Sequence, residues 1–153
     1  MNSPDPAGVA RSVIESNLYM TLGTADETGT PWAAPVCYVA AAGHREFYWA
    51  SRPEARHSRN LAVRPSLSVV IFDSQVPVYQ GRAVYLEAVG EQLTGADLHA
   101  GIAIYNGPAA ERGSAILERT DLEAPAPHRL YRATVVQSWI LDGSDIRIPL
   151  DAR

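Results

Sequence analysis

Strand-type segments follow one another through most of this chain, and few helical segments separate them. Between Leu18 and Leu93, apolar residues recur in runs of strand length, bounded by turn residues at 27–30 and 42–44. Parallel strands need a long, usually helical, crossover between each pair. Helical patterns are too few here to supply those crossovers. The order therefore favours a mainly β fold, an antiparallel β-barrel with a few peripheral helices.

The helices are predicted from spacing and capping signals. Apolar residues at helical spacing indicate a first helix that ends near Asn17 and another over 95–106. Ser51 followed by Glu54 has the form of a capping box, so a helix over 52–63 is predicted, with Ser51 as its N-cap.

The strands are predicted from the alternation of apolar and polar residues. Residues 18–51 indicate a three-stranded meander, and 128–143 the last strand. Consecutive apolar residues over 66–72 indicate a strand buried on both faces, whereas the alternation in 81–93 indicates one buried face.

Size and charge limit the classes of function. A chain of 153 residues fits a single domain over 1–153, and a large ligand must then lie in a surface groove or between two copies. The formal net charge is -4, and all 13 basic residues are arginine. This balance argues against nucleic acid or an anionic membrane surface as a partner, because both attract a dense positive field.

Cysteine usage and hydropathy give further expectations. The single cysteine, Cys37, cannot form an internal disulfide and is predicted to be a small core residue. No Cys/His cluster has the spacing of a metal site, and no apolar run approaches the ~20 residues of a membrane span. We expect a cytoplasmic protein without a signal peptide or a bound metal.

The segment WASRPEARHSRNLAVRP carries the most chemistry, because a strand ends there and a helix begins. Helix N-termini present unpaired amide donors, and guanidinium groups suit phosphate. The alternative is a solvated helix face with a capping serine. The candidate anion-binding residues are Ser51, Arg56, His57, Ser58, Arg59 and Asn60.

Other residues give weaker signals. The four histidines form no triad-like pattern, and there is neither a GxGxxG motif nor a P-loop. Trp32, Trp49 and Trp139 lie on or beside predicted strands, where they either pack in the core or line a pocket for a flat ring.

The order LGTADETGTPWAAPVCYV, EFYWAS, ARHSRNLAVRPSLSVVIF and AVYLEAVGEQL resembles the flavin-binding split barrels related to pyridoxamine 5'-phosphate oxidase. The resemblance runs over 18–90, with a weaker part over 130–147. It implies an antiparallel split β-barrel, a homodimer with FMN at the subunit interface, and a flavin-dependent oxidoreductase acting on a small substrate.

The resemblance also assigns cofactor-binding residues by position. It implies that Ser51, Arg56 and His57 hold the FMN phosphate, with help from Arg59 or Asn60. A glutamine before the next strand, here Gln80, and an aromatic residue in the last strand, here Trp139, complete the site. The flavin ring is expected to be bordered by Pro35, Val36, Cys37, Tyr38 and Ala50.

Two departures from the family pattern change the expectation. His57 stands where the family usually has lysine, so phosphate binding is expected to be weaker or pH-dependent. The Arg-x-His that binds substrate phosphate in true pyridoxamine phosphate oxidases is replaced by Arg147-Ile148-Pro149. Vitamin B6 oxidation is therefore not expected.

The reaction itself is left open. Flavin chemistry belongs to the cofactor, so no catalytic residue is assigned. The alternatives are a reductase that uses the deazaflavin F420, and a flavin-binding protein without enzymatic activity. Residues 95–127 resemble the family least, and they form either a lid over the ring or an outer spacer.

Overall fold

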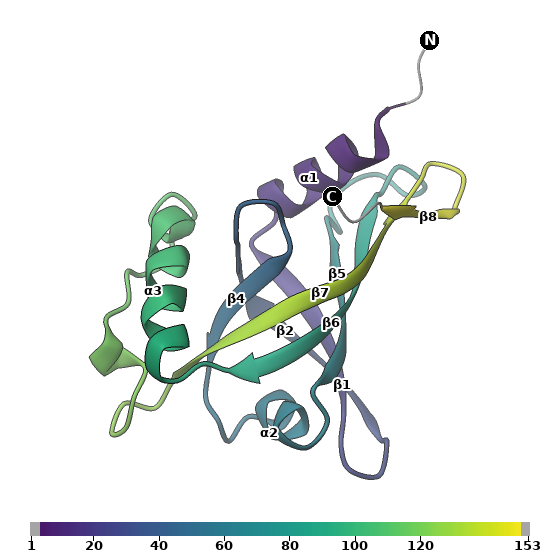
Figure 1. Ribbon diagram of the computed structural model, residues 1–153. Helices are drawn as coiled ribbons and strands as arrows, with labels where there is room; N and C mark the ends of the chain where they lie inside the picture. Colours follow the sequence, from purple (N-terminus) through teal and green to yellow (C-terminus); the bar gives the residue numbers. More distant parts are fainter. Residues whose placement is uncertain (1–3, 151–153) are drawn as a thin grey trace.

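Antiparallel strands with one buried and one exposed face make up most of the molecule. The computed structural model describes residues 4–150, in which one sheet carries three α-helices and a short 3-10 helix (Figure 1). The helices are α1 (Pro6–Ser16), α2 (Arg56–Val63), α3 (Gly95–Ala109) and the 3-10 helix η1 (Arg119–Asp121). The strands are β1 (Tyr19–Ala25), β2 (Pro31–Cys37), β3 (Val39–Ala40), β4 (Glu46–Ser51), β5 (Ser66–Phe72), β6 (Ala83–Gln92), β7 (Arg129–Leu141) and β8 (Arg147–Leu150).

The sheet curls until its two edge strands approach each other. Its order is β2-β1-β5-β6-β7-β4-β3, with β8 beside β7, and every pairing is antiparallel. Strands β2 and β3 stand at opposite ends of this order, yet only Tyr38 separates them in the chain. The sheet must therefore bend round into an open barrel (Figure 1). The expected antiparallel split barrel with peripheral helices is confirmed; the ends of the expected 1–153 domain lie outside the described residues.

The barrel interior holds the main hydrophobic core, and α1 packs against it. Alternation along the strands turns residues such as Leu22, Ile71 and Trp49 inward. Helix α1 adds Ala10 and Ile14 from its buried face. The Asp5 side chain caps the helix by accepting from the amides of Ala7 and Gly8 at 3.3 and 3.2 Å. The expected first helix is confirmed.

Tyr38 joins this helix to the place where the barrel edges approach. Its hydroxyl donates to the Ile14 carbonyl at 2.5 Å. Burial raises the pKa of Tyr38 to about 12, so the phenol stays protonated and remains a donor. The guanidinium of Arg112, which follows α3, lies 4.6 Å from the Tyr38 ring centroid and donates to the carbonyls of Tyr38 and Asn17.

Helix α3 covers the outer face of β4 and β7. Along β4, Phe47 and Trp49 face the barrel interior, whereas Tyr48 belongs to a second core. That second core is closed by residues of the segment 95–127. Its buried members are Val39, Tyr48, Leu93, Leu98, Tyr105, Ala109, Leu122 and Leu130.

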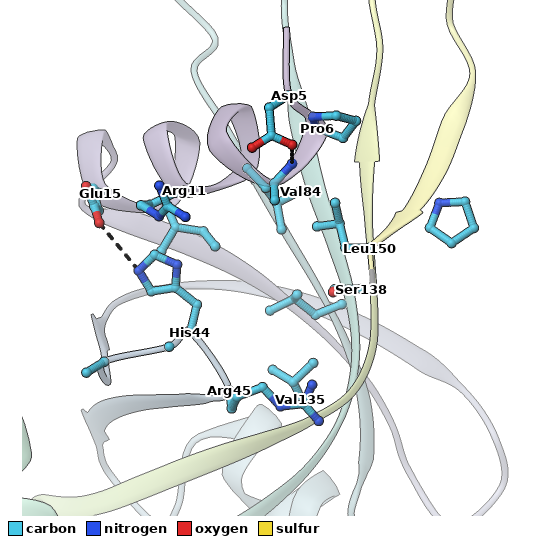
Figure 2. A pocket seen from close by; sticks show the side chains of 17 residues that line it. Asp5, Pro6, Arg11, Glu15, His44, Arg45, Val84, Val135, Ser138 and Leu150 are labelled. Atoms are coloured by element: carbon cyan, nitrogen blue, oxygen red, sulfur yellow. Dashed lines mark hydrogen bonds and ion pairs between the residues drawn. The ribbon is translucent and has the colours of Figure 1, made fainter. Parts of the chain in front are cut away.

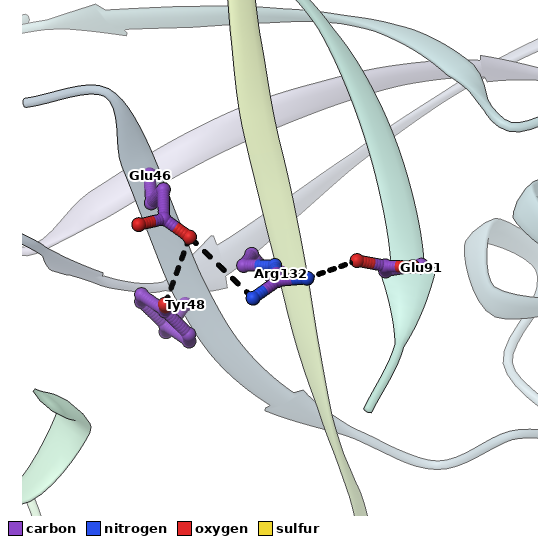
Figure 3. Close-up of polar contacts among 4 residues, drawn as sticks. All are labelled: Glu46, Tyr48, Glu91 and Arg132. Atoms are coloured by element: carbon purple, nitrogen blue, oxygen red, sulfur yellow. Dashed lines mark hydrogen bonds and ion pairs between the residues drawn. The ribbon is translucent and has the colours of Figure 1, made fainter. Parts of the chain in front are cut away.

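An ion-pair network crosses β4, β7 and β6 (Figure 3). Arg132 on β7 pairs with Glu46 on β4 at 3.5 Å and with Glu91 on β6. The Tyr48 hydroxyl donates to Glu46 at 3.1 Å. The hydrogen bond to Glu91 raises the pKa of Arg132. Because the carboxylates are partly exposed, we expect this network to fix the register of the strands more than to add stability.

Two sequence expectations about strands are wrong. Residues 18–51 do not form a continuous meander: β1 and β2 pair, but β4 pairs with β7, because the chain breaks at Tyr38 to cross the barrel opening. Strand β5 is buried on one face only, with Ser66, Ser68 and Phe72 exposed. Strand β8 was not expected.

The capping-box prediction is also wrong. Ser51 is the last residue of β4 and pairs with Arg129 in the ladder, so it cannot cap a helix. Residues 52–55 form a turn in which the Ala55 amide donates to the Arg52 carbonyl at 3.1 Å, and α2 begins only at Arg56. The other predicted elements are confirmed, although α3 extends to Ala109. Across positions 4–150, every helix is too short or too polar to span a lipid bilayer.

Candidate functional site

The start of α2 presents unpaired backbone donors. Ala55 is the N-cap residue, and no side chain within residues 4–150 caps this end. The first turn contains no acidic residue, and the first amide bonded inside the helix is that of Arg59, which donates to the Ala55 carbonyl at 2.9 Å. The free amides and the helix dipole therefore favour an anion at this end.

Ser51 and His57 meet beside this helix end. The His57 Nε2 atom lies 2.9 Å from the Ser51 Oγ atom, and the imidazole is half-buried. Burial lowers the pKa of His57 below its ordinary value, so the ring is neutral at neutral pH. The structure thus brings together two of the predicted phosphate residues, and the histidine starts from its uncharged form.

Arg56 lies over the indole of Trp32. The guanidinium carbon is 4.2 Å from the ring centroid, which is a cation–π contact between α2 and the start of β2. Both side chains are exposed. The nearby Asp26 carboxylate has a lowered pKa, mainly from its hydrogen bonds with Thr28 and Thr30 and in smaller part from Arg56. Arg56 is therefore held in place with its charge open to solvent.

The remaining predicted residues of α2 divide between two faces. Arg59 is exposed on the same side as Arg56. Ser58 and Asn60 are buried, and the Asn60 side chain donates to the Thr24 hydroxyl at 3.1 Å. The Ser58 hydroxyl has no hydrogen-bond partner in the described chain. Asn60 is thus engaged inside the barrel, where it fixes α2 against β1.

The predicted ring-binding residues lie on or next to strands. Pro35 and Cys37 point outward from β2, whereas Val36 and Tyr38 are buried. The expectation that Cys37 is a core residue is wrong, because β2 is an edge strand and nothing within the described chain covers its outer face. At about 3.3 Å per residue, Pro35 to Cys37 lie roughly 10–17 Å along β2 from Trp32.

Ala50 opens onto a cavity of about 470 Å³ on the α3 side of the sheet. Its lining includes Tyr105, Leu122 and His128. Residues of the segment 95–127 therefore form one wall of a hollow next to a predicted ring-binding residue. The open alternatives for this segment, a lid or an outer spacer, reduce to a wall fixed by its own hydrophobic core.

Gln80 and Trp139 lie away from this cluster. Trp139 pairs with Tyr85 and Pro149, ten positions along β7 from Arg129, so roughly 33 Å separates it from Ser51. Gln80 lies in the exposed loop that follows β5, whereas α2 precedes β5. One chain does not bring these two residues to Arg56.

Arg129 is a candidate that the sequence reasoning missed. It faces Ser51 across the β4–β7 ladder, and its Nη1 atom donates to the carbonyls of Ala126 and His128. Only the strand register places this charge beside the α2 terminus, so no local motif could have shown it. Within the described range, no group of His, Cys, Asp and Glu is arranged to hold a metal ion.

Comparison with known families gives one match over most of the chain. The family model described as pyridoxamine 5'-phosphate oxidase matches residues 8–138. No curated protein matches the sequence closely enough to count as a relative.

Several solved structures share the fold. A heme-binding protein from Mycobacterium smegmatis has a TM-score of 0.75 at 24% identity, over 98% of this chain and 59% of its own. An FAD-binding protein from Mesorhizobium loti has a TM-score of 0.64 at 18% identity, over 88% of this chain and 92% of its own. An F420 reductase has a TM-score of 0.59 at 17% identity, over 84% and 94%. The chain thus spans only about three-fifths of the length of the heme-binding protein.

Proposed function

Because the chain belongs to the pyridoxamine 5'-phosphate oxidase family, we propose that it is a flavoprotein that binds FMN and carries out a flavin redox reaction on a small substrate. The observation that supports FMN most directly is the uncapped start of α2, with Arg56 beside it and Ser51 and His57 in contact. Unpaired amides, a guanidinium and hydrogen-bonding side chains together suit a phosphate dianion.

The residues present fit the cofactor along its length. The phosphate would lie against Arg56, His57 and Ser51, with Arg59 and Arg129 adding positive charge. From there the exposed edge of β2 leads past Trp32 to Pro35–Cys37, and an edge strand offers backbone groups without ladder partners. Bound FMN would supply the exchange of electrons with the substrate. The role of this chain would be to hold and orient the flavin.

We place the substrate outside the vitamin B6 phosphates. Arg147 lies in β8, where its guanidinium is 5.6 Å from the Tyr85 ring centroid, and Ile148 and Pro149 follow it. No histidine is available there to complete a second phosphate site. The cavity beside Ala50, walled by Tyr105 and Leu122, is where we expect a small substrate to approach the flavin.

Reduction separates an enzyme from a carrier. If the protein is a redox enzyme, we expect NADPH or NADH, added without oxygen to the FMN-loaded protein, to bleach the flavin absorbance within a catalytic time scale. Dithionite serves as the positive control, because it reduces accessible flavin without help from the protein. Bleaching by dithionite alone would contradict the redox proposal for these donors and favour a flavin-binding protein without enzymatic activity.

We further propose that the functional unit is a homodimer. Gln80 and Trp139 lie at the opposite end of the sheet from α2, so a site that uses them with Arg56 needs a second copy. Apolar side chains are exposed on the outer face of neighbouring strands, namely Tyr19 on β1, Phe72 on β5 and Val89 on β6. Contiguous exposed apolar surface of this kind is typical of protein interfaces.

Light scattering tests the dimer. We expect a mass of twice 16.6 kDa for the wild type. Val89→Arg places a charge in the apolar outer face and is expected to give monomers with lost FMN retention. Ile116→Arg, an equally exposed position on the α3 side, is expected to leave the dimer unchanged. A monomeric wild type that retains FMN would contradict this part of the proposal.

A pH dependence follows from His57. Burial lowers its pKa, and a bound phosphate would raise it again by favouring the charged imidazole. FMN affinity is therefore expected to increase as the pH falls from about 8 to about 6, around the ordinary histidine pKa. The phosphate of FMN itself titrates near 6, so the wild type is compared with His57→Gln in flavin fluorescence titrations. Parallel pH profiles for the two proteins would remove His57 from the phosphate site.

The second candidate cofactor is F420. Arg52 and Arg59 are exposed on either side of Arg56, so the site carries more positive charge than one phosphate requires. A longer anionic tail could use that charge. Competition distinguishes the two cofactors: F420 that displaces FMN at lower concentration than FMN displaces F420 would favour the deazaflavin.

A further inference from the structure

A cavity of about 670 Å³ lies beneath α1, at the end of the barrel away from α2 (Figure 2). Its walls come from α1, the turn between β3 and β4, and strands β6, β7 and β8. Ser138 lines it, nine positions along β7 from Arg129, which is roughly 30 Å from the proposed phosphate site. Its volume is within the range of small-molecule pockets, and barrel mouths commonly hold such ligands.

The floor of this cavity is apolar and rigid. Ala10 and Ile14 from α1 face Val84, Leu86 and Val135 from the barrel interior, and all five side chains are buried. These residues belong to the main core, so the floor is formed by packing that the fold itself requires. A ligand that lies on this floor must present a compact hydrocarbon body.

The rim of the cavity carries an imbalance of charge. Asp5 is occupied as the N-cap of α1, and the exposed Glu15 lies 3.7 Å from His44. Arg11 and Arg45 line the same cavity without an ion pair or a side-chain hydrogen bond among residues 4–150. Figure 2 shows Arg11 on α1 and Arg45 beyond His44, near Val135. Two guanidinium groups thus stand at the edge of an apolar floor, and the described part of the chain assigns no anion to them.

His44 adds a neutral polar group between the two arginines. Burial lowers the pKa of His44, and the charge of Arg11 lowers it further, although Glu15 acts in the opposite direction. A neutral imidazole can accept or donate one hydrogen bond and does not compete with the arginines for their anion. The turn that carries it is fixed by positive φ angles at Gly43 and His44.

We infer that this cavity is a second ligand site, for a small organic carboxylate with a compact apolar body. The carboxylate would bind the guanidinium groups of Arg11 and Arg45, and the hydrocarbon would cover Ala10, Ile14 and Val135. A low-dielectric floor below two cations strengthens their attraction for an anion. This site is independent of the flavin and would remain if the cofactor were a different one.

The test uses 1-naphthoate as the probe and the full chain labelled with ¹⁵N. We expect saturable amide shifts at Ala10, Ile14, Val84 and Val135, and a Kd at least about tenfold tighter than that of the neutral analogue 1-naphthalenemethanol, because charge-assisted bonds are the stronger ones. Arg11→Ala combined with Arg45→Ala is expected to weaken naphthoate binding by about tenfold or more. Both side chains are exposed and form no ion pair within residues 4–150, so the fold should tolerate their loss.

Arg56→Ala serves as the matched control, because it removes one guanidinium from the other end of the barrel. Naphthoate affinity should be unchanged in that variant. The inference is overturned if the lining amides do not shift at saturating probe, if the alcohol binds as tightly as the acid, or if Arg56→Ala weakens binding as much as the double variant does.

Discussion

Replacing both Arg56 and His57 by alanine is expected to abolish retention of FMN while the fold remains. Each substitution removes a group that would bind the phosphate, and hydrogen bonds to charged groups contribute about 1.5–3 kcal/mol. The loss should therefore be at least about a hundredfold in Kd. The free energy of unfolding should fall by only about 1 kcal/mol, because the Ser51 hydroxyl loses its bond to His57.

The matched control removes the same two residue types elsewhere. Arg119 and His99 are exposed on the α3 side of the molecule, away from α2. Arg119→Ala with His99→Ala changes the net charge equally and is expected to keep FMN affinity within about twofold, since distant surface charges are screened at physiological salt. Equal FMN affinity in the two double variants, measured by fluorescence quenching, would refute the assignment of the phosphate site.

Trp49→Ala is expected to cause the largest loss of stability. Trp49 is 0% exposed, and its indole stacks on the Tyr131 ring with centroids 5.6 Å apart. Substitution leaves a cavity between β4 and β7 in the middle of the barrel. Deleting a buried tryptophan costs about 3–5 kcal/mol, a large fraction of the total stability of an ordinary domain. Denaturant unfolding followed by far-UV circular dichroism measures the change.

Trp32→Ala tests whether the effect belongs to burial or to tryptophan itself. Trp32 is 42% exposed and touches Arg56 by a cation–π contact. Its loss should cost about 1 kcal/mol of stability, but it should weaken FMN binding because Arg56 loses its support. If both variants lost the same stability, the barrel interior would not be organised around Trp49 as described.

Local patterns predicted the elements that depend on local physics. The alternation of Val84, Leu86 and Ala88 placed one face of β6 in the core, and the spacing of Ala10 and Ile14 placed one face of α1 there. Side-chain periodicity is set within a few residues, so it can be recognised without knowledge of the partners. The family pattern then supplied the closed topology, which periodicity alone does not determine.

The wrong predictions concern residues whose role depends on distant partners. Ser51 has the sequence of an N-cap, but Arg129 lies opposite it in the β4–β7 ladder and keeps it in the strand. Cys37 is apolar among apolar neighbours, yet β2 is an edge strand and leaves it exposed. Strand order decides both cases, and strand order is not contained in a local pattern.

The candidate site divides in the same way. Arg56 and His57 were identified from the strand-to-helix junction and lie together, because they are neighbours in sequence. Arg129 and the support of Arg56 by Trp32 arise from register and from packing between elements. Gln80 and Trp139 belong to the far end of the sheet, so their membership of the site stays a prediction that depends on the dimer.

The identity of the bound chromophore tests the central claim most directly. The full chain is purified without added cofactor, its visible spectrum is recorded, and the mass of the chromophore released by denaturation is measured by mass spectrometry. We predict the two-band spectrum of an oxidised flavin and the mass of FMN. The single band of F420, the Soret band of heme, or a colourless protein that takes up no added FMN would contradict the account.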